Sequence, residues 1–244
     1  MCDHDGVIGG ASVAAQARIP EIFEWAEYYC PWCYIGAVRL DAVMPEFEGR
    51  VNLRTRAFPL EIVGGGPPNR LELEQEWWLA ALQEPRATFA PYRSHDWPTT
   101  TLPAFDAAVC AGRQGEAERC DIDLRIRRAF FAESRNIGRP EVMLDIAQEA
   151  GLDMRRFERD FVDPTVRAEV LDEAHRGYDA YDVRGTPTLM LEDGTVLHHA
   201  FATADFENDR ISAVQPLPCC GDGCLDATRD LIRMALVPAR TSAM

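Results

Sequence analysis

Residues 28–36 read YYCPWCYIG, a stretch in which proline and tryptophan separate two cysteines. If a strand ends before Cys30, Pro31 falls at the first position of a helix, where the N–H that proline lacks would have no partner anyway. Cys30 then caps the helix, and backbone N–H groups and the positive end of the helix dipole favour its thiolate. Cys33 lies one turn further on, within reach of a mixed disulfide on Cys30. The spacing therefore predicts thiol–disulfide exchange, with Cys30 as nucleophile and Cys33 as resolving thiol.

Two other interpretations of this pair compete with the redox one: half of a zinc site, or a buried pair without a chemical role. A structural zinc site needs four ligands, and a matching second C-x-x-C is absent from the sequence. The proline inside the motif also favours a helix start over a metal-binding turn. We therefore expect a redox pair and no metal at these cysteines.

The hydrophobic pattern around the cysteines predicts an α/β fold. Residues 21–28 are strand-like, residues 33–44 have helical spacing, and residues 52–58 alternate as a strand does. A Gly- and Pro-rich break follows at residues 63–69, and it lacks the lysine of a phosphate-binding loop. Helical patterns then continue to about residue 181. The first part of the chain therefore predicts a β-α-β unit followed by a helical block.

Strand signals return near the C-terminus. Residues 186–191 form a short apolar run, Asp193-Gly194 is a hairpin turn signal, and residues 224–236 resemble an amphipathic helix. This order predicts a thioredoxin-like fold with a large all-helical insertion. The predicted parts are a flexible N-terminal tail (1–18), two halves of the thioredoxin-like domain (19–62 and 182–242) and the helical insertion (63–181).

The dipeptide Thr186-Pro187 opens the predicted strand in the second half. Proline is tolerated at the start of a strand, and a cis bond there would be a deliberate feature. Such a bond would turn the backbone of Thr186 towards an extended peptide lying beside the thiol. We therefore expect Trp32, Thr186 and Pro187 to contact the substrate.

The chain resembles the DsbA family of thioredoxin-fold proteins, and most closely its FrnE-type branch of dithiol–disulfide isomerases. The matching segments are EYYCPWCYIG (27–36), RTRAFPLE (54–61), AFFAESRNIGRPEVMLDIAQEAGLD (129–153) and VRGTPTLMLEDG (183–194). The resemblance implies that Cys30 is the nucleophile, Cys33 the resolving thiol and Pro187 a cis-proline. Two segments depart from the family pattern: residues 201–223 form a longer connection, and residues 84–103 have no clear counterpart.

A buried carboxylate is a further expectation, because many thioredoxin-fold proteins have one near this place that accepts a proton from the resolving cysteine. Glu24 lies six residues before Cys30, and strand alternation puts it on one face with Ile22 and Ala26. Burial would raise its pKa and fit it for this work near neutrality. Glu27 is the other candidate, and the sequence leaves the choice between the two open.

A second group of cysteines lies in the stretch PCCGDGC, which holds Cys219, Cys220 and Cys224. A second redox pair, an incomplete metal site and unpaired thiols are the three interpretations. The other ligands for such a metal site are His198, His199, Cys2 and His4. We prefer a Cys219–Cys224 disulfide, because adjacent cysteines rarely bridge each other and Cys220–Cys224 closes a tighter loop.

The remaining cysteines and the aromatic residues of the helical block are expected to have structural roles rather than chemical ones. Cys110 and Cys120 lie in helical patterns, where we expect buried, inert thiols. The residues expected to lie mostly in the core, with some lining a groove above Cys30, are Trp77, Trp78, Phe130 and Phe131.

The amino-acid composition argues against some classes of binding partner. Its formal net charge is −15, and all 25 cationic side chains apart from histidine are arginine. A strongly acidic surface disfavours nucleic acid, and no apolar run is long enough to span a membrane. The N-terminus lacks a basic leader and a strong apolar segment, so we expect a cytoplasmic protein.

These observations favour a thiol–disulfide oxidoreductase or isomerase that acts on protein dithiols or disulfides. No cofactor is expected; glutathione is a candidate redox partner, client proteins are the expected substrates, and the recycling partner is open. One alternative is a glutathione-dependent transferase or small-molecule isomerase of the kappa type, although related proteins of that type lack a complete C-x-x-C. A second alternative is a thiol-bearing holdase or a metal-binding protein.

Overall fold

The computed structural model describes residues 18–64 and 69–237. Its strands are β1 (Glu21–Ala26), β2 (Asn52–Ala57), β3 (Thr188–Leu191), β4 (Val196–Leu197), β5 (Ala204–Glu207) and β6 (Arg210–Val214). Its helices are α1 (Pro31–Val43), α2 (Leu60–Val63), α3 (Arg70–Gln83), α4 (Leu102–Gly112), α5 (Glu116–Phe131), α6 (Pro140–Glu149), α7 (Met154–Phe161), α8 (Pro164–Ala180) and α9 (Asp222–Met234), and a 3-10 turn, η1 (Met44–Phe47), follows α1. Most of the predicted tail, residues 1–17, lies outside the described residues.

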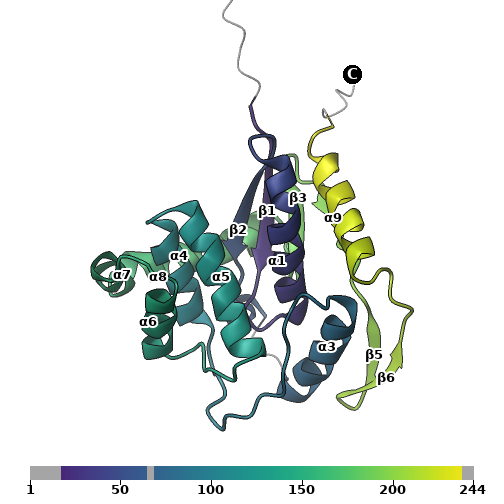
Figure 1. Cartoon of the computed structure of the whole chain (residues 1–244), viewed down its shortest axis with the longest axis horizontal. Coiled ribbons are helices and arrows are strands. Elements are labelled where there is room, and N and C mark those ends of the chain that lie inside the picture. Colours follow the sequence, from purple (N-terminus) through teal and green to yellow (C-terminus); the bar gives the residue numbers. More distant parts are fainter. Residues whose placement is uncertain (1–17, 65–68, 238–244) are drawn as a thin grey trace, which may run out of the picture.

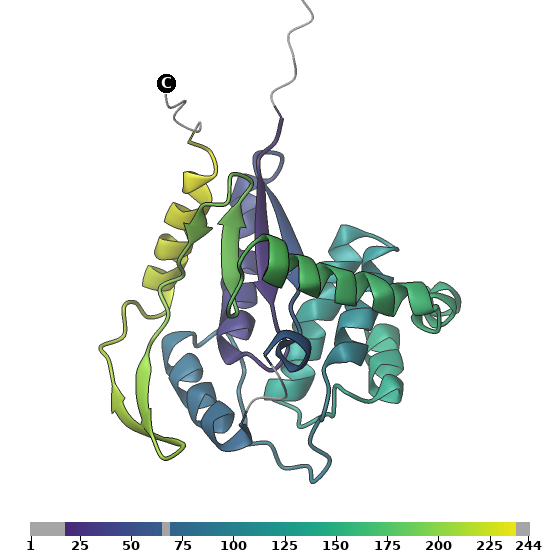
Figure 2. The ribbon, with the colours of Figure 1, turned by 180° about the vertical axis from the view of Figure 1, so that it is seen from behind.

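A four-stranded sheet in the order β2-β1-β3-β4 forms the centre of the molecule. Strand β1 pairs in parallel with β2 and antiparallel with β3. A parallel neighbour requires a crossover, which α1 provides on one face of the sheet, with α9 beside it (Figure 1). Helix α8 crosses the opposite face (Figure 2). This arrangement confirms the predicted fold class.

The helical block shares its core with the loop that carries the cysteines. Every strand of the described chain lies outside residues 63–181, as the sequence predicts. Within the block, Trp77 packs edge-on against Phe130, with ring centroids 5.3 Å apart. Tyr29 contacts Phe130, and Tyr34 stacks on Phe131 at 5.3 Å. Large buried rings contribute much of the packing energy of a core, so this cluster fastens the helices to the N-terminal end of α1.

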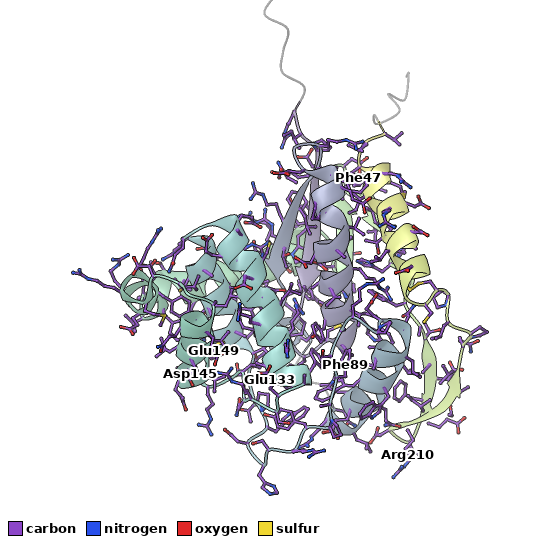
Figure 3. All side chains as sticks on the ribbon, in the orientation of Figure 1. Phe47, Phe89, Glu133, Asp145, Glu149 and Arg210 are labelled. Carbon is purple, nitrogen blue, oxygen red and sulfur yellow. A yellow bond between two sulfur atoms is a disulfide. The ribbon has the colours of Figure 1, made fainter. Side chains whose placement is uncertain are left out.

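A second, smaller core lies between α1, the sheet and α9. Ile22, Leu40, Leu189 and Ile232 belong to it. Figure 3 marks Phe47 in this smaller core and Phe89 in the larger one, towards opposite ends of α1. The two cores therefore anchor both ends of the helix that begins at the cysteine pair.

The segments without a clear counterpart in the family have defined structures. Residues 201–223 contain the β5–β6 hairpin, which carries Arg210 and lies against α3 (Figure 3). Gln75 of α3 holds this hairpin, since its side chain donates to the Asp209 carbonyl at 2.7 Å and accepts from the Ile211 N–H at 3.0 Å. The structure assigns no helix or strand to residues 84–101, although Ala87 and Tyr92 are buried there.

Helix α1 begins at Pro31 with Cys30 as its N-cap, as the CPWC spacing predicts. Other local predictions were wrong. Cys120 is exposed, since it lies on the side of α5 away from the buried Ile122 and Ile126, whereas Cys110 is buried as expected. Trp78 is 47% exposed, because α3 buries the stripe that contains its neighbour Trp77 instead.

Within the described residues, no helix is both long enough and apolar enough to cross a lipid bilayer.

Candidate active site

The CPWC motif occupies the start of α1, as its spacing predicts. Cys30 is the N-cap of the helix, Pro31 is its first residue, and the Cys33 N–H donates to the Cys30 Sγ at 3.3 Å. Both cysteines carry free thiols in the described part of the chain. Cys30 is 7% exposed and Cys33 is inaccessible, so only Cys30 can meet a substrate sulfur. The N-terminus of α1 and the donated Cys33 N–H thus both face the Cys30 sulfur.

A loop from the other half of the chain completes the surroundings of Cys30. The peptide bond between Thr186 and Pro187 is cis. The Thr186 carbonyl oxygen lies 3.4 Å from the Cys30 Sγ. Both loop residues are partly exposed, and so is Trp32, whose ring centroid lies 5.7 Å from that of Phe201. The structure thus brings the three residues expected to bind substrate next to the more accessible thiol.

Cys33 lies in an environment that keeps it protonated. Burial raises the pKa of its thiol well above the usual range, and the neighbouring Cys30 raises it further. The Glu27 N–H donates to its Sγ at 3.4 Å, and the Arg127 guanidinium favours its charged form. Since burial dominates, Cys33 needs a base before it can attack a disulfide.

Glu24 is buried beneath α1, as strand alternation suggested. Burial raises the pKa of its carboxyl to about 7, against the opposing effect of Arg127. Its Oε2 accepts from the Thr55 hydroxyl at 3.4 Å, whereas its Oε1 finds no hydrogen-bond partner among the described residues. A carboxyl with a pKa near neutrality and an uncommitted oxygen can take up and release a proton.

Glu27 is also buried, but its carboxylate is committed to the backbone. One oxygen accepts from the N–H groups of Tyr28 and Tyr29, at 2.6 and 3.2 Å, and the other accepts from the Leu60 N–H at 2.6 Å. Burial raises its pKa to about 7 as well. One Glu27 oxygen thus holds the loop before Cys30 and the other holds the start of α2, whereas Glu24 keeps one oxygen without a hydrogen bond to the described residues.

Sequence reasoning missed a buried ion pair behind the motif. Arg127 of α5 pairs with Asp123, one turn earlier, with 2.8 Å between Nε and Oδ2. Its Nη1 donates to the Glu27 carbonyl at 3.0 Å, and its guanidinium lies over the Tyr28 ring. The signal was present, since the pair is spaced i, i+4 beside the apolar stripe of Ile122 and Ile126, but only the tertiary structure shows that this face meets the cysteine loop.

Cys219 and Cys224 form a disulfide, the pairing preferred from the sequence. Cys220 between them is exposed and carries a free thiol. The Gln83 amide nitrogen lies 3.5 Å from the Cys219 Sγ and donates to the Ala200 carbonyl at 2.6 Å. This second pair therefore lies against α3 and the segment that follows β4.

No group of three or more His, Cys, Asp or Glu side chains within residues 18–64 and 69–237 has the arrangement of a metal site. Cys2 and His4, considered above as metal ligands, lie outside the described residues.

A family model described as the DSBA-like thioredoxin domain matches residues 21–212. The chain belongs to this family. Members of the DSBA-like family are disulfide oxidoreductases, and this chain is a thioredoxin-like oxidoreductase of the same family. The CPWC pair at the start of α1 and the cis-Pro187 loop beside it lie inside the matched residues.

One curated relative and several solved structures resemble this DSBA-like protein. The relative is the uncharacterized protein YwbO of Bacillus subtilis (strain 168), 24% identical over 194 residues that cover 75% of this chain and 92% of YwbO. A provisionally assigned protein disulfide isomerase from Nitrosomonas europaea matches with a TM-score of 0.67 at 15% identity, covering 90% of this chain and 98% of its own. The cytosolic disulfide reductase DsbM from Pseudomonas aeruginosa, solved with glutathione, matches with a TM-score of 0.60 at 22% identity, covering 73% and 89%.

A small-molecule enzyme shares the fold of this DSBA-like protein as well. The structure of 2-hydroxychromene-2-carboxylate isomerase matches with a TM-score of 0.54 at 17% identity, covering 71% of this chain and 86% of its own. At such identities the structural matches establish the fold alone, and the chemistry has to be argued from the site.

Proposed function

We propose that this DSBA-like protein is a protein disulfide oxidoreductase that works through Cys30 and Cys33. The observation that carries the proposal is the position of the Cys30 Sγ, which caps α1 and lies 3.4 Å from the Thr186 carbonyl. A nucleophilic sulfur at a helix N-terminus, with a buried second thiol one turn away, is the arrangement that disulfide exchange requires.

The reaction consists of two exchanges that balance. The Cys30 thiolate attacks a client disulfide, forms a mixed disulfide and releases one client thiolate. Cys33 then loses its proton and attacks the Cys30 sulfur, so that the Cys30–Cys33 disulfide forms and the second client thiolate leaves. The client gains two electrons and the protein loses two; the reverse sequence oxidises a client dithiol.

Glu24 is the proposed acceptor of the Cys33 proton. Burial keeps Cys33 as a thiol, so the second exchange depends on a nearby base. Glu24, with a pKa raised to about 7, is poised to act in both directions of the reaction near neutral pH.

The residues around Cys30 are the proposed binding site for the client. Thr186 and Pro187 are partly exposed, so an extended client segment can pair with the backbone at Thr186 while its sulfur meets Cys30. Trp32 adds an apolar surface next to this position. We further propose that the protein works in the cytoplasm without a cofactor, with glutathione as a candidate redox partner and an unidentified recycling partner.

The reduction potential of the Cys30–Cys33 pair tests the proposal. The protein with Cys219, Cys220 and Cys224 replaced by alanine is equilibrated in glutathione buffers, and the fluorescence of Trp32 reports the redox state. A potential near roughly −270 mV is expected for a cytoplasmic reductase or isomerase. A value near roughly −120 mV would mark an oxidant and contradict the cytoplasmic assignment. The absence of any two-electron transition would overturn the proposed function.

The small-molecule alternative is favoured only by the shared fold with the chromene carboxylate isomerase. The complete CPWC pair argues against it, since an isomerase that uses glutathione as a cofactor has no need of a resolving thiol. Retention of the Cys33→Ser variant on immobilised glutathione, together with isomerase turnover that survives this substitution, would support the alternative. Turnover of client disulfides that is lost in the same variant supports our proposal.

We also propose that Cys219–Cys224 is a second redox pair. Its support is the exposed Cys220 thiol beside the bond, which gives thiol reagents access to the segment. Thiol trapping followed by mass spectrometry tests this: we expect one labelled cysteine of the three in the oxidised protein and three after mild reduction. Labelling of all three cysteines in an air-oxidised sample would contradict the proposed second redox pair.

The holdase alternative makes a different prediction. A holdase in which the thiols are incidental keeps its protection of unfolded clients in a Cys30→Ala, Cys33→Ala double variant, whereas an oxidoreductase loses disulfide exchange in that variant.

A further inference from the structure

Three groups from separate parts of the chain meet beside Gly36 of α1. The point that a Cβ of Gly36 would occupy lies 3.7 Å from the Glu24 Oε1, 3.9 Å from the His199 Nε2 and 3.6 Å from the Phe201 ring. Glu24 comes from β1, and the two aromatic residues come from the segment after β4. The bare position of Gly36 therefore leaves a small space into which a carboxylate oxygen and an imidazole nitrogen both face.

The two polar atoms have no partner within the described chain. The Glu24 Oε1 and the His199 Nε2 are both buried, and neither makes a hydrogen bond to the described residues. Buried polar atoms in proteins are almost always hydrogen-bonded, often to an ordered water. A methyl group at Gly36 would touch both atoms at ordinary contact distances, so the absence of a side chain at this position leaves room beside them.

We propose that a water held beside Gly36 bridges the Glu24 Oε1 and the His199 Nε2, and that His199 relays the active-site proton to solvent. This inference rests on the proposed function, because it gives the proton released by Cys33 a way out. Cys33 and Gly36 are three residues apart on one helix face, with about 5–6 Å between such Cβ positions. The water thus lies one helical turn from the resolving thiol.

His199 lies at the boundary between the interior and the surface. Its Nε2 is buried, whereas the residue as a whole remains partly exposed. The ring stacks on Phe201, with centroids 4.7 Å apart, and Phe201 in turn contacts Trp32. A neutral imidazole can accept a proton on one nitrogen as it releases another from the second, so the ring carries a proton without holding a net charge.

The charged groups around both residues are compatible with such a relay. Arg119, Asp123 and Arg127 of α5 face Glu24, together with the Thr55 hydroxyl of β2. Burial raises the pKa of Glu24 to about 7.

Arg39 of α1 faces His199, and its own charge is paired with the buried Glu84 at 3.0 Å. Burial and Arg39 lower the pKa of His199 to about 3, so its imidazole stays neutral and its Nε2 can accept a hydrogen bond. Neither Glu24 nor His199 therefore traps the proton at neutral pH.

The proton transfer balances. As the Cys33 thiol gives up its proton to attack the Cys30 sulfur, Glu24 binds that proton. The water then passes a proton from Glu24 to the His199 Nε2, and Nδ1 releases one to solvent. In the reverse direction of the exchange each of these transfers runs backwards.

A competing exit is visible in the structure. Glu24 also borders a cavity of about 680 Å³ between α1, β2 and α5, whose lining includes Leu40, Leu53 and Arg119. A proton that left through this cavity would not depend on His199.

Two substitutions test the relay from opposite sides. Gly36→Ala places a methyl group where the water is proposed, and His199→Phe removes the accepting nitrogen but keeps a ring against Phe201. Gly36→Ala also improves the helix, so a failure to fold is not expected of it. Matched controls are Gly223→Ala in α9, where a methyl group meets nothing within 4 Å, and His198→Phe at an exposed position.

The first measurement is the titration of Glu24 in the reduced protein, followed by the infrared band of its carboxyl group and identified by its loss in Glu24→Gln. Loss of a hydrogen bond to the carboxylate is expected to raise the pKa of Glu24 by about 1 in both test variants and to leave both controls unchanged. The second is the pH profile of exchange with oxidised glutathione, where the test variants are expected to be about fivefold slower at pH 7 and to recover at higher pH.

Each outcome decides the matter. An unshifted Glu24 titration in Gly36→Ala and His199→Phe, or an equal shift in the controls, would overturn the relay. An upward shift in both test variants alone supports it. If the unaltered protein exchanges no disulfide with oxidised glutathione, the proposed function fails, while the Glu24 titration still decides the bridge between Glu24 and His199.

Discussion

The Cys30 Sγ lies 3.4 Å from the carbonyl oxygen of Thr186, although 156 residues separate them in the chain. This contact joins the two halves of the thioredoxin-like domain at the point where the helical insertion also packs. The Cys30 sulfur therefore lies between a helix N-terminus and the backbone that leads into β3.

Replacing Cys33 with serine is expected to trap the mixed disulfide. A serine hydroxyl is a far weaker nucleophile than a thiolate, so the Cys30 adduct cannot be resolved from within the protein. Incubation with oxidised glutathione and mass spectrometry should show one stable glutathione adduct in Cys33→Ser. The adduct should not accumulate in Cys220→Ser, and a Cys33→Ser protein that stays unmodified contradicts the assignment of roles.

Replacing Glu24 with glutamine is expected to change how stability depends on pH. The folded protein holds the Glu24 proton up to about pH 7, whereas the ordinary pKa of this carboxyl is 4.5. Stability relative to the glutamine variant is therefore lost as pH rises from 4.5 through 7, by about 3 kcal/mol in total. Denaturant unfolding at pH 5 and pH 8 measures this. Glu158→Gln, which removes an exposed carboxylate, is the control, and equal pH dependence of Glu24→Gln and the unaltered protein would refute the prediction.

Replacing Arg127 with methionine is expected to destabilise the fold by about 3–5 kcal/mol, because Asp123 would be left as a buried unpaired charge. Adding Asp123→Asn should recover part of the loss. Unfolding free energies of the two single variants and the double variant give the coupling energy. If the losses of the two single variants add up to the loss of the double variant, Arg127 and Asp123 do not stabilise the fold as a pair, and each acts separately on the loop before Cys30.

Removing the second disulfide is expected to cost about 2 kcal/mol, since it closes only a short loop between residues five apart. The Cys219→Ala, Cys224→Ala variant should unfold at lower denaturant concentration, and added dithiothreitol should affect the unaltered protein but not the variant. Cys220→Ala should behave like the unaltered protein under both conditions. A double variant as stable as the oxidised protein would mean that the bond contributes nothing to folding.

Replacing Trp32 with histidine is expected to make the Cys30–Cys33 pair more oxidising. An imidazolium next to Cys30 would stabilise the thiolate and with it the reduced protein, whereas the indole carries no charge. We expect the reduction potential to rise by roughly 30 mV, which corresponds to about 1.4 kcal/mol. Trp32→Phe, which stays uncharged, is the control; a potential that falls in Trp32→His would contradict the argument.

Local signals account for the parts of the site that were predicted correctly. Pro31 after Cys30 is a helix-start signal that depends on neighbouring residues alone, and α1 begins there. The hairpin β5–β6 was not predicted, because residues 201–223 hold weak strand signals and Gln75, far away in the chain, binds the hairpin. Cys120 was misplaced because it lies on the side of α5 away from the buried Ile122 and Ile126.

The sequence by itself determined that a helix begins at the Cys30–Cys33 motif and that a β-α-β unit precedes a helical block, and it indicated the pairing of Cys219 with Cys224, since each of these depends on spacing within a short stretch. Only the tertiary structure showed that Glu27 is committed to backbone hydrogen bonds while one oxygen of Glu24 is not, placed Arg127 behind Cys33, and brought His199 to the space beside Gly36. Hydrogen-bond commitments and burial depend on residues that are distant in the chain, so they arise when the sheet and helices pack together.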